Sequence, residues 1–335
     1  MTTPPVTLDT AGELVEIDCA LGWVDELLAE AIGDLGRSGV ASPTVGVRVE
    51  RSREAFPVRG WEPVTRGAWR QGTRVVVANG CSSGFDVHLE CSGERADFTY
   101  RWRPPARERV AARLLPARFH LLSRAVLLQY PAIWWASTRS RAPLHASVCT
   151  AGGVGCLLAG PGGVGKSTLL QRELEQGGHA ACDNLCVSDG VIAHGVVEPL
   201  RVEGGTGRRM PHGRREAVLG RRVPALQPER VLVIRRGLGE AGTVRRCDPA
   251  EAARSLTAGT YMAGELRRFW GFAATLALAS GVGPAHPPVA EVAGDLCRRL
   301  PCLQVDLPAR PGPSLGELLA NGVNGVNGVE ERLWT

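Results

Sequence analysis

The chain has 335 residues, enough for two domains, and its 44% hydrophobic and 22% charged residues are typical of a globular protein that buries a core. The net charge of +5 is mild, no apolar run reaches the roughly 20 residues of a membrane span, and residues 1–9 lack the features of a secretory signal. The sequence therefore favours a cytoplasmic protein with no membrane partner, whose ten cysteines, none in a C-x-x-C pair, are reduced thiols.

Residues 1–140 are expected to form a small α+β domain that binds substrate or assembles the protein. The first dozen residues have no regular pattern and are expected to be disordered. Residues 13–35 place apolar side chains at helical spacing, which predicts one or two helices. Four short runs are typical of strands, and the last two predict a hairpin: residues 45–49, 73–78, 85–91 and 96–102. Residues 107–135 are predicted to be mostly helical, with breaks near Pro116 and Pro131.

Residues 141–320 are expected to form a second domain of α/β type. Two strands, near Val148 and over 155–159, lead into a glycine-rich loop, and a helix over 167–176 follows. A strand over 179–183 then precedes a hairpin with an Asp-Gly turn. The remaining predicted elements are strands over 231–234 and 302–307, helices from Asp248, over 265–280, over 289–300 and from Ser314, and a flexible tail over 321–335 that begins with three Asn-Gly-Val repeats.

Positive charge is concentrated in the window 201–236, which has ten arginines against three glutamates. Its net charge is +7, so the rest of the chain sums to −2. Such a window suits phosphates or an acidic partner, and it is equally compatible with a solvated basic face. Aromatic residues are not interleaved with these arginines, which disfavours nucleic-acid binding.

The loop over 160–167 reads GPGGVGKS and matches the P-loop, or Walker A, pattern G-x-x-x-x-G-K-[ST] in full. It leaves an apolar strand and enters a helix, so its backbone N–H groups and the helix N-terminus can hold phosphate oxygens. Lys166 is expected to reach the terminal phosphates and Ser167 to hold Mg²⁺. The residues predicted to bind the nucleotide are Gly160, Gly162, Gly163, Val164, Gly165, Lys166, Ser167 and Thr168.

The lysine of this loop is the only lysine in the chain. Of the 39 lysine and arginine residues, 38 are arginine. A strong compositional bias toward arginine has spared lysine at one position, where a compact ammonium is needed and a planar guanidinium does not substitute freely. The composition therefore supports the P-loop reading independently of the motif.

Two polar residues near the loop are candidates for chemistry. Asp183 ends the strand that follows the P-loop helix, which predicts a carboxylate beside the loop that holds the metal or takes a proton; the alternative is that it only caps the next turn. His145 lies fifteen residues before the loop. A lone histidine is usually structural, so spacing alone gives it a weaker claim to the site.

The run from Leu144 to Val187 resembles the HPr kinase/phosphorylase family and its wider set of HPr-kinase-related proteins. It reads LHASVCTAGGVGCLLAGPGGVGKSTLLQRELEQGGHAACDNLCV. Family members show a histidine in an H-[AG]-S segment, a short hairpin, the P-loop, a helix ending in Gly-His, and an Asp-Asp or Asp-Asn pair. The match is close over this run and loose over 144–320. The resemblance implies an α/β fold with an HPr-kinase/PEP-carboxykinase-like P-loop domain after the small N-terminal domain.

The resemblance also implies an activity and its residues. The activity is transfer of the γ-phosphate of ATP, with Mg²⁺, to the hydroxyl of a serine in a peptide, protein or small molecule. Asp183 takes the role of the family's catalytic base, His145 that of the histidine beside the phosphates, and Lys166 acts on the phosphates. The implied metal-binding residues are Ser167, Asp183 and Glu198, the last as a second acid. The family tends to form rings, which implies a homo-oligomer.

Departures from the family pattern keep an alternative open. The pair is Asp183-Asn184, so one acid of an Asp-Asp pair is missing, and residues 1–140 do not resemble the family's N-terminal domain. Related proteins include peptide-modifying kinases of natural-product pathways, for which an acidic precursor peptide would suit the basic window. The alternative is a non-catalytic ATP-binding sensor or scaffold. A motor or transporter NTPase is disfavoured, since the strand over 231–234 ends in arginines and not in acids.

Overall fold

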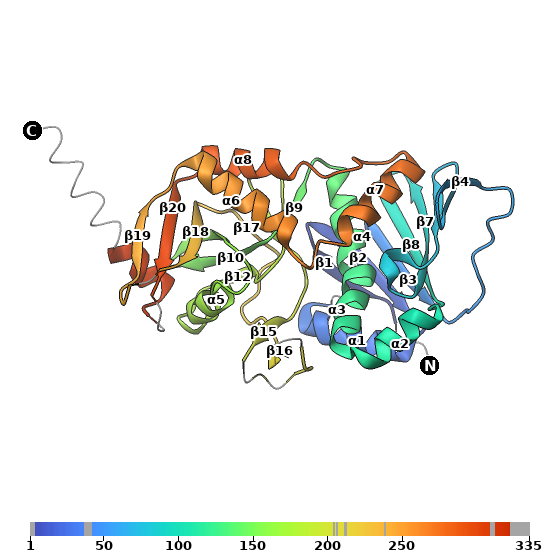
Figure 1. Ribbon diagram of the computed structural model, residues 1–335, viewed down its shortest axis with the longest axis horizontal. Coiled ribbons are helices and arrows are strands. Elements are labelled where there is room, and N and C mark those ends of the chain that lie inside the picture. The colour runs from blue at the N-terminus through green and yellow to red at the C-terminus, as the bar shows by residue number, and fades with distance from the viewer. Residues whose placement is uncertain are drawn as a thin grey trace, which may run out of the picture. The chain divides into compact units, whose positions relative to one another are not determined.

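A computed structural model describes residues 4–36, 42–203, 205, 207–210, 213–237, 239–308 and 312–321 (Figure 1). The chain divides into two compact units, neither of which is continuous in sequence. Unit 1 comprises Met1–Ser140, Val197–Val218 and Glu265–Pro287, and unit 2 comprises Arg141–Val196, Leu219–Gly264 and Pro288–Thr335. The single boundary expected at residue 140 does not account for the two later segments of unit 1. The functional roles expected of the two domains stay predictions. No helix in the described ranges is long and apolar enough to cross a membrane.

Unit 1 is built on a sheet of eight strands in the order β1-β2-β3-β8-β7-β6-β5-β4. Their bounds are Val6–Thr10 (β1), Glu13–Cys19 (β2), Val45–Glu50 (β3), Glu62–Thr65 (β4), Ala68–Gln71 (β5), Arg74–Val77 (β6), Phe85–Ser92 (β7) and Arg95–Trp102 (β8). The expected hairpin of β7 and β8 is confirmed, with Ser92 opposite Arg95. Strand β3 is parallel to both of its neighbours, so the sheet is mixed.

The N-terminal expectations need two corrections. The first dozen residues, expected to be disordered, contain β1, and the first part of the expected helix over 13–35 is β2. In β2 the buried side chains alternate with half-buried ones, Val15, Ile17 and Cys19 facing the core, which is the period of a strand. The apolar residues that suggested one helix belong to two elements, strand β2 and helix α1, which spans Gly22–Ile32.

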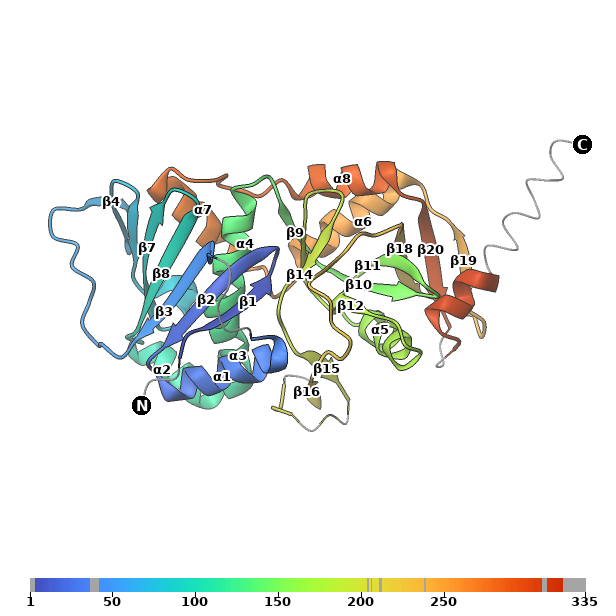
Figure 2. The same ribbon diagram turned by 180° about the vertical axis from the view of Figure 1, so that it is seen from behind.

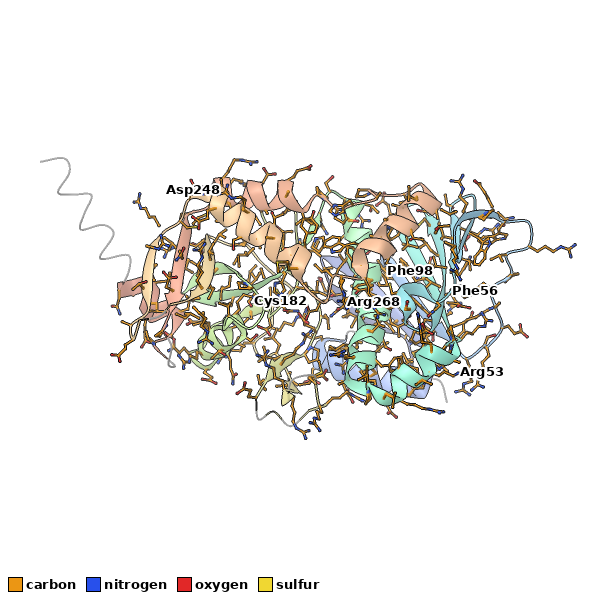
Figure 3. All side chains as sticks on the ribbon, in the orientation of Figure 1. Arg53, Phe56, Phe98, Cys182, Asp248 and Arg268 are labelled. Atoms are coloured by element: carbon orange, nitrogen blue, oxygen red, sulfur yellow. The ribbon has the colours of Figure 1, made fainter. Side chains whose placement is uncertain are left out.

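Helices α4 and α7 pack against the sheet of unit 1. The helical elements of this unit after α1 are α2 (Ala106–Leu114), α3 (Pro116–Arg124), a π-helical turn (Ala125–Gln129), α4 (Tyr130–Ser137) and α7 (Phe269–Ser280). Helix α4 contacts β2 and β3, and α7 contacts β4, β5 and β6. Phe98 of β8, labelled in Figure 3, has its ring 5.8 Å from that of Trp134 and 6.5 Å from that of Phe272. The expected breaks appear, since α3 begins at Pro116 and the π turn precedes Pro131.

Unit 2 contains a six-stranded sheet in the order β12-β10-β11-β18-β20-β19 (Figure 2). Its strands are β10 (Ala146–Ala151), β11 (Val154–Ala159), β12 (Ala180–Cys182), β18 (Arg230–Arg236), β19 (Thr243–Arg246) and β20 (Cys302–Leu307). Strands β11, β18 and β20 are parallel, whereas β10, β12 and β19 run antiparallel to their neighbours. A four-stranded sheet adds β9 (Ala142–Leu144), β13 (Cys186–Ser188), β14 (Ala193–Gly195) and β17 (Ala225–Leu226).

The helices of unit 2 begin where the sequence predicts. Helix α5 (Lys166–Glu175) contacts β10, α6 (Pro249–Met262) contacts β9, β11 and β18, and α8 (Val289–Arg299) contacts α6 and β9. Asp248 caps α6 by accepting a hydrogen bond from the Glu251 N–H at 3.0 Å. Ser314 and Glu317 form a reciprocal capping box before the helical residues 315–321. The tail from 322 lies outside the described residues.

Candidate functional site

The P-loop joins β11 to α5 in a conformation that requires glycine. Gly160, Gly163 and Gly165 have φ values of 150°, 79° and 119°, which side-chain-bearing residues rarely adopt. A Cβ on Gly160 would lie 2.7 Å from the carbonyl oxygen of Ile234, so the loop leaves β11 in close contact with β18. At Gly162 and Gly163, by contrast, a Cβ would meet nothing within 4 Å. The loop therefore offers an open glycine face to a ligand.

The N-terminus of α5 has no side-chain cap. Its N-cap is Gly165, and the first turn has no acidic residue to offset the positive end of the helix dipole. Lys166 is 6% exposed, and its ammonium donates to the carbonyl oxygens of Gly160 at 2.8 Å and Pro161 at 3.1 Å. Ser167 is half-buried beside it, Val164 is buried and Thr168 is exposed. An uncapped helix end with a lysine at its first position is the arrangement that binds polyphosphate anions.

Strand pairing brings Asp183 and His145 to the sheet edge where the loop begins. Ala146, the first residue of β10, pairs with Ala159, the last residue of β11. Cys182, the last residue of β12 and labelled in Figure 3, pairs with Val148 near the same end of β10. His145 directly precedes β10 and Asp183 directly follows β12. Three connections, before β10, after β11 and after β12, thus meet at one edge.

His145 is held at two points. It is 5% exposed, its backbone N–H donates to Thr260 Oγ1 at 3.0 Å, and its Nε2 lies 3.0 Å from Asn184 Oδ1. Since an amide oxygen can only accept, this orientation of Asn184 gives Nε2 the proton. Thr260 is fully buried on α6, where its hydroxyl donates to the Leu256 carbonyl at 2.8 Å. The residue is therefore held through its backbone by Thr260 and through its ring by Asn184.

Asp183 is 5% exposed and is fixed through its backbone. The hydroxyl of Ser147 on β10 donates to the Asp183 carbonyl oxygen, which leaves the side chain out of this contact. The next residue, Asn184, bonds to His145, and its amide nitrogen Nδ2 has no hydrogen-bond partner among the described residues. A buried amide donor without a partner, next to a buried carboxylate, suits a site that takes an oxygen-rich ligand.

The predicted metal-binding residues are divided between the two units. Ser167 and Asp183 both belong to unit 2, whereas Glu198 belongs to unit 1, where it pairs with Arg201 at 3.2 Å. The described residues contain no group of three His, Cys, Asp or Glu side chains that could hold a metal by themselves. Mg²⁺ is commonly held by one or two protein oxygens together with substrate phosphates, which Ser167 and Asp183 are suited to provide. Glu198 as a second metal-binding acid stays a prediction.

Burial disfavours ionisation of two cysteines on the strands beside the loop. All ten cysteines of the chain are free thiols. Burial is the main cause that raises the pKa of Cys149 on β10 far above its ordinary value, with a smaller contribution from Cys156. Burial likewise raises the pKa of Cys156 on β11 to about 12. Both thiols therefore resist conversion to the thiolate, which is the nucleophilic form of a cysteine.

The basic window over 201–236 is divided between the two units, since Val197–Val218 belongs to unit 1 and Leu219–Gly264 to unit 2. Several of its arginines are taken up by acids of their own unit: Arg201 by Glu198 and Glu265, Arg208 by Glu30, and Arg235 by Glu251. These three side chains are therefore engaged in ion pairs within their own units, whereas a role of the window toward phosphates or an acidic partner stays a prediction.

Sequence reasoning missed three residues of this edge. Asn184 was visible only as a departure from an Asp-Asp pair, although it contacts His145. Thr260 gives no local signal, since it follows His145 by 115 residues and reaches it only through the packing of α6. Arg236 ends β18 with its Nη2 3.8 Å from the position of a Cβ on Gly165, and it was counted only as part of the basic window. Its place at the end of a strand beside the P-loop is the signal that could have identified Arg236.

No protein-family model matches the chain. No curated protein matches it either. Among solved structures, it is similar to the Hpr(Ser) kinase/phosphatase from Coxiella burnetii, with 13% sequence identity over 57% of this chain and 95% of that protein, and a TM-score of 0.29. Structural similarity at this level supports no conclusion about the chemistry of this chain, which depends on the residues described above.

Proposed function

We propose that this chain is an ATP- and Mg²⁺-dependent kinase that transfers the γ-phosphate to a hydroxyl group, with a serine of a peptide, protein or small molecule as acceptor. The observation that carries the proposal is the sheet edge itself, where a glycine loop ending in Lys166 meets a buried carboxylate, Asp183, and an oriented histidine, His145. Phosphoryl transfer needs positioning and charge neutralisation more than covalent chemistry by the protein, and these groups supply both.

Each residue of the edge has a role in this reaction. When bound, ATP supplies the phosphoryl group and Mg²⁺ neutralises its oxygens. Lys166 pairs with the terminal phosphates, and the hydroxyl of Ser167 is available to the metal. Asp183 accepts the proton of the acceptor hydroxyl, whose oxygen forms the new bond to phosphorus while the bond to ADP breaks. His145, which is held by Asn184 and Thr260, would act beside the phosphates.

The loop fits such a ligand on structural grounds. Positions Gly162 and Gly163 leave open space where side chains would stand, and the helix N-terminus behind them has no cap of its own. The ammonium of Lys166 donates to the carbonyl oxygens of Gly160 and Pro161, which carry only partial negative charge, in the hydrogen bonds given above. Phosphate oxygens carry full charge and would compete well for the same ammonium.

The test is a mass-resolved assay of the purified chain with ATP and Mg²⁺. The acceptors are free serine and serine-containing peptides encoded beside its gene. We expect an acceptor to gain one phosphate, and we expect Lys166→Ala to abolish this gain. Asp183→Asn is expected to lower the transfer rate by roughly 10²–10⁴-fold, the usual contribution of a general base, while ATP still binds. Full activity of Asp183→Asn would remove the base assignment.

A matched control is available in the next turn. Asp189 accepts hydrogen bonds from the N–H groups of Val191 and Ile192, both at 2.9 Å, with one oxygen that asparagine retains. Asp189→Asn makes the same chemical change as Asp183→Asn in a hairpin turn, and it should leave transfer unchanged. Tight ATP binding without modification of any acceptor would favour the alternative, a non-catalytic ATP sensor.

A further inference from the structure

The carboxyl ends of three parallel strands of unit 2 meet beside the P-loop. Strand β18 lies between β11 and β20, with Val233 paired to Ala159 on one side and Arg236 paired to Leu307 on the other. Gly160 approaches the carbonyl of Ile234 on β18, so the loop begins directly against this strand. The last residue of β18, Arg236, therefore emerges where the loop returns toward α5.

Arg236 reaches the end of the loop. A Cβ built on Gly165 would lie 3.8 Å from Arg236 Nη2 and 3.1 Å from Leu307 Cδ1. Gly165 is the N-cap of α5 and directly precedes Lys166, so the guanidinium stands at the helix end that is suited to phosphates. The strand end fixes the Arg236 backbone, and its side chain is exposed.

The two arginines at the end of β18 differ in their partners. Arg235 forms an ion pair with Glu251 on α6 at 2.6 Å. For Arg236, the described residues provide no hydrogen-bond or ion-pair partner of its guanidinium, although it carries the same charge one position along. A cation beside a phosphate-binding loop that is not neutralised by an acid of its own unit remains available to an anionic ligand.

We propose that Arg236 is a second phosphate-binding cation, which pairs with the terminal phosphates of the nucleotide on the β18 side of the loop. The inference rests on the proposed function, because it assigns a residue to the same nucleotide site. A guanidinium presents a planar fork of donors that matches two phosphate oxygens at once, which the ammonium of Lys166 cannot do. The two cations thus have different tasks, one as a point charge and one as a bidentate clamp.

The inference is tested by nucleotide binding, measured by calorimetry with Mg·ATP and Mg·ADP on the full chain. Arg236→Ala is expected to raise the Kd for ATP by about tenfold or more, the typical loss for one charge-assisted contact. The Kd for ADP should rise less, since ADP lacks the terminal phosphate. Arg236→Lys should recover only part of the affinity, because it restores the charge without the planar fork.

Arg235→Ala is the matched control, since it removes the same charge from the adjacent exposed position. It should leave both affinities within about twofold of the wild type, as a surface pair contributes little. If Arg236→Ala behaves as Arg235→Ala does while the wild type binds both nucleotides, only the inference about Arg236 is overturned. If the wild type binds neither nucleotide, the proposed function fails as well. Thermal unfolding of each variant distinguishes a loss of nucleotide binding from a loss of the folded structure.

Discussion

A single hydroxyl, that of Thr260, links α6 to the sheet edge beside the P-loop. It accepts from the His145 backbone N–H and donates to the Leu256 carbonyl, so it satisfies two polar groups at once in a fully buried position. Thr260→Val keeps the shape and removes the hydroxyl. It leaves a buried N–H without a partner, which typically costs about 1–3 kcal/mol.

We therefore expect Thr260→Val to lower the free energy of unfolding by that amount in urea denaturation. It should also reduce transfer more than it reduces ATP affinity, because its hydroxyl fixes the backbone of His145. Thr260→Ser is the control, since it retains the oxygen and loses only a methyl group. Equal stability and equal activity of the two variants would show that the hydroxyl does not position His145.

At the scale of the element, the first glycine of the P-loop and its middle glycines are required for different reasons. Gly160 combines a φ of 150° with a Cβ position 2.7 Å from the Ile234 carbonyl, a backbone atom that cannot move aside cheaply. Gly160→Ala should separate the loop from β18 and destabilise the chain by roughly 1–3 kcal/mol, as overpacked sites do. Gly162→Ala, where a Cβ meets nothing within 4 Å, should change stability by no more than about 0.5 kcal/mol. Thermal unfolding of the two variants measures the difference, and equal melting temperatures would contradict it.

Elements with a local chemical signal were predictable from the sequence. The Asp-Pro start of α6, the Ser-x-x-Glu start before 315 and the hairpin turn at Asp189-Gly190 each carry their own signature, and the structure has all three. Strand β2 was missed because its apolar residues continue into α1 without a turn signal between them. Apolar residues recur with a period of two over the seven residues of β2 and with a period of 3.6 over the eleven residues of α1. Together the two periods form one pattern that resembles a helix.

At the scale of the molecule, the sequence could not predict which segments share a unit. Neighbouring strands carry the P-loop with Lys166 and bring Asp183 to the same sheet edge, so motif spacing was enough to predict these positions. The assignment of Val197–Val218 to unit 1 depends on contacts with helices about a hundred residues away: Arg124 donates to both Glu216 and Glu30. Ion pairs between distant segments produce no periodic pattern in the sequence. Part of the basic window over 201–236 therefore serves as an anchor within unit 1.

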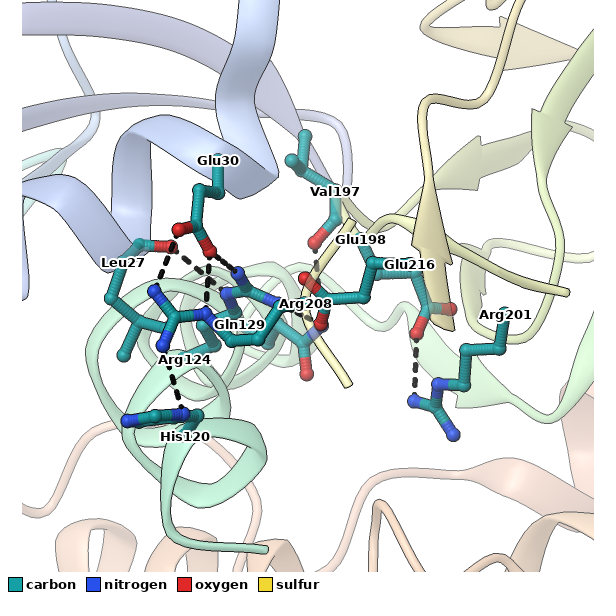
Figure 4. A network of polar contacts seen from close by, with 10 residues as sticks. All are labelled: Leu27, Glu30, His120, Arg124, Gln129, Val197, Glu198, Arg201, Arg208 and Glu216. Atoms are coloured by element: carbon teal, nitrogen blue, oxygen red, sulfur yellow. Dashed lines mark hydrogen bonds and ion pairs between the residues drawn. The ribbon is translucent and has the colours of Figure 1, made fainter. Parts of the chain in front are cut away.

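This anchor is a cluster of charged groups in unit 1, shown in Figure 4. Arg124 is 3% exposed and binds Glu216, Glu30 and the Leu27 carbonyl, while Arg208 binds Glu30 at 2.6 Å. His120 completes it, since Arg208 Nη1 lies 3.2 Å from its Nδ1. A guanidinium can only donate, so Nδ1 must accept, and the ring in this contact is neutral.

The cluster predicts a pH dependence of stability. Burial is the main cause that lowers the pKa of His120 below its usual value, followed by the charges of Arg208 and Arg124, while Glu30 opposes them. As the pH falls below about 6.5, the unfolded chain takes up this proton before the folded chain does. The contribution of a neutral His120 is therefore present above that pH and is lost as the pH falls through the lower pKa of the folded state.

Replacement of His120 by glutamine separates this effect from other titrations. His120→Gln can keep an acceptor for Arg208 but does not titrate, so its melting temperature should fall less between pH 7.5 and pH 5.5 than that of the wild type. His88, whose pKa is also lowered mainly by burial, contributes equally to both proteins. Glu30 has its pKa lowered chiefly by the hydrogen bond from Arg208, so it titrates below this range. An equal or larger fall in His120→Gln would mean that the cluster does not depend on a neutral ring, and that unit 1 retains the Val197–Val218 segment through the carboxylate pairs of Arg124 and Arg208 alone.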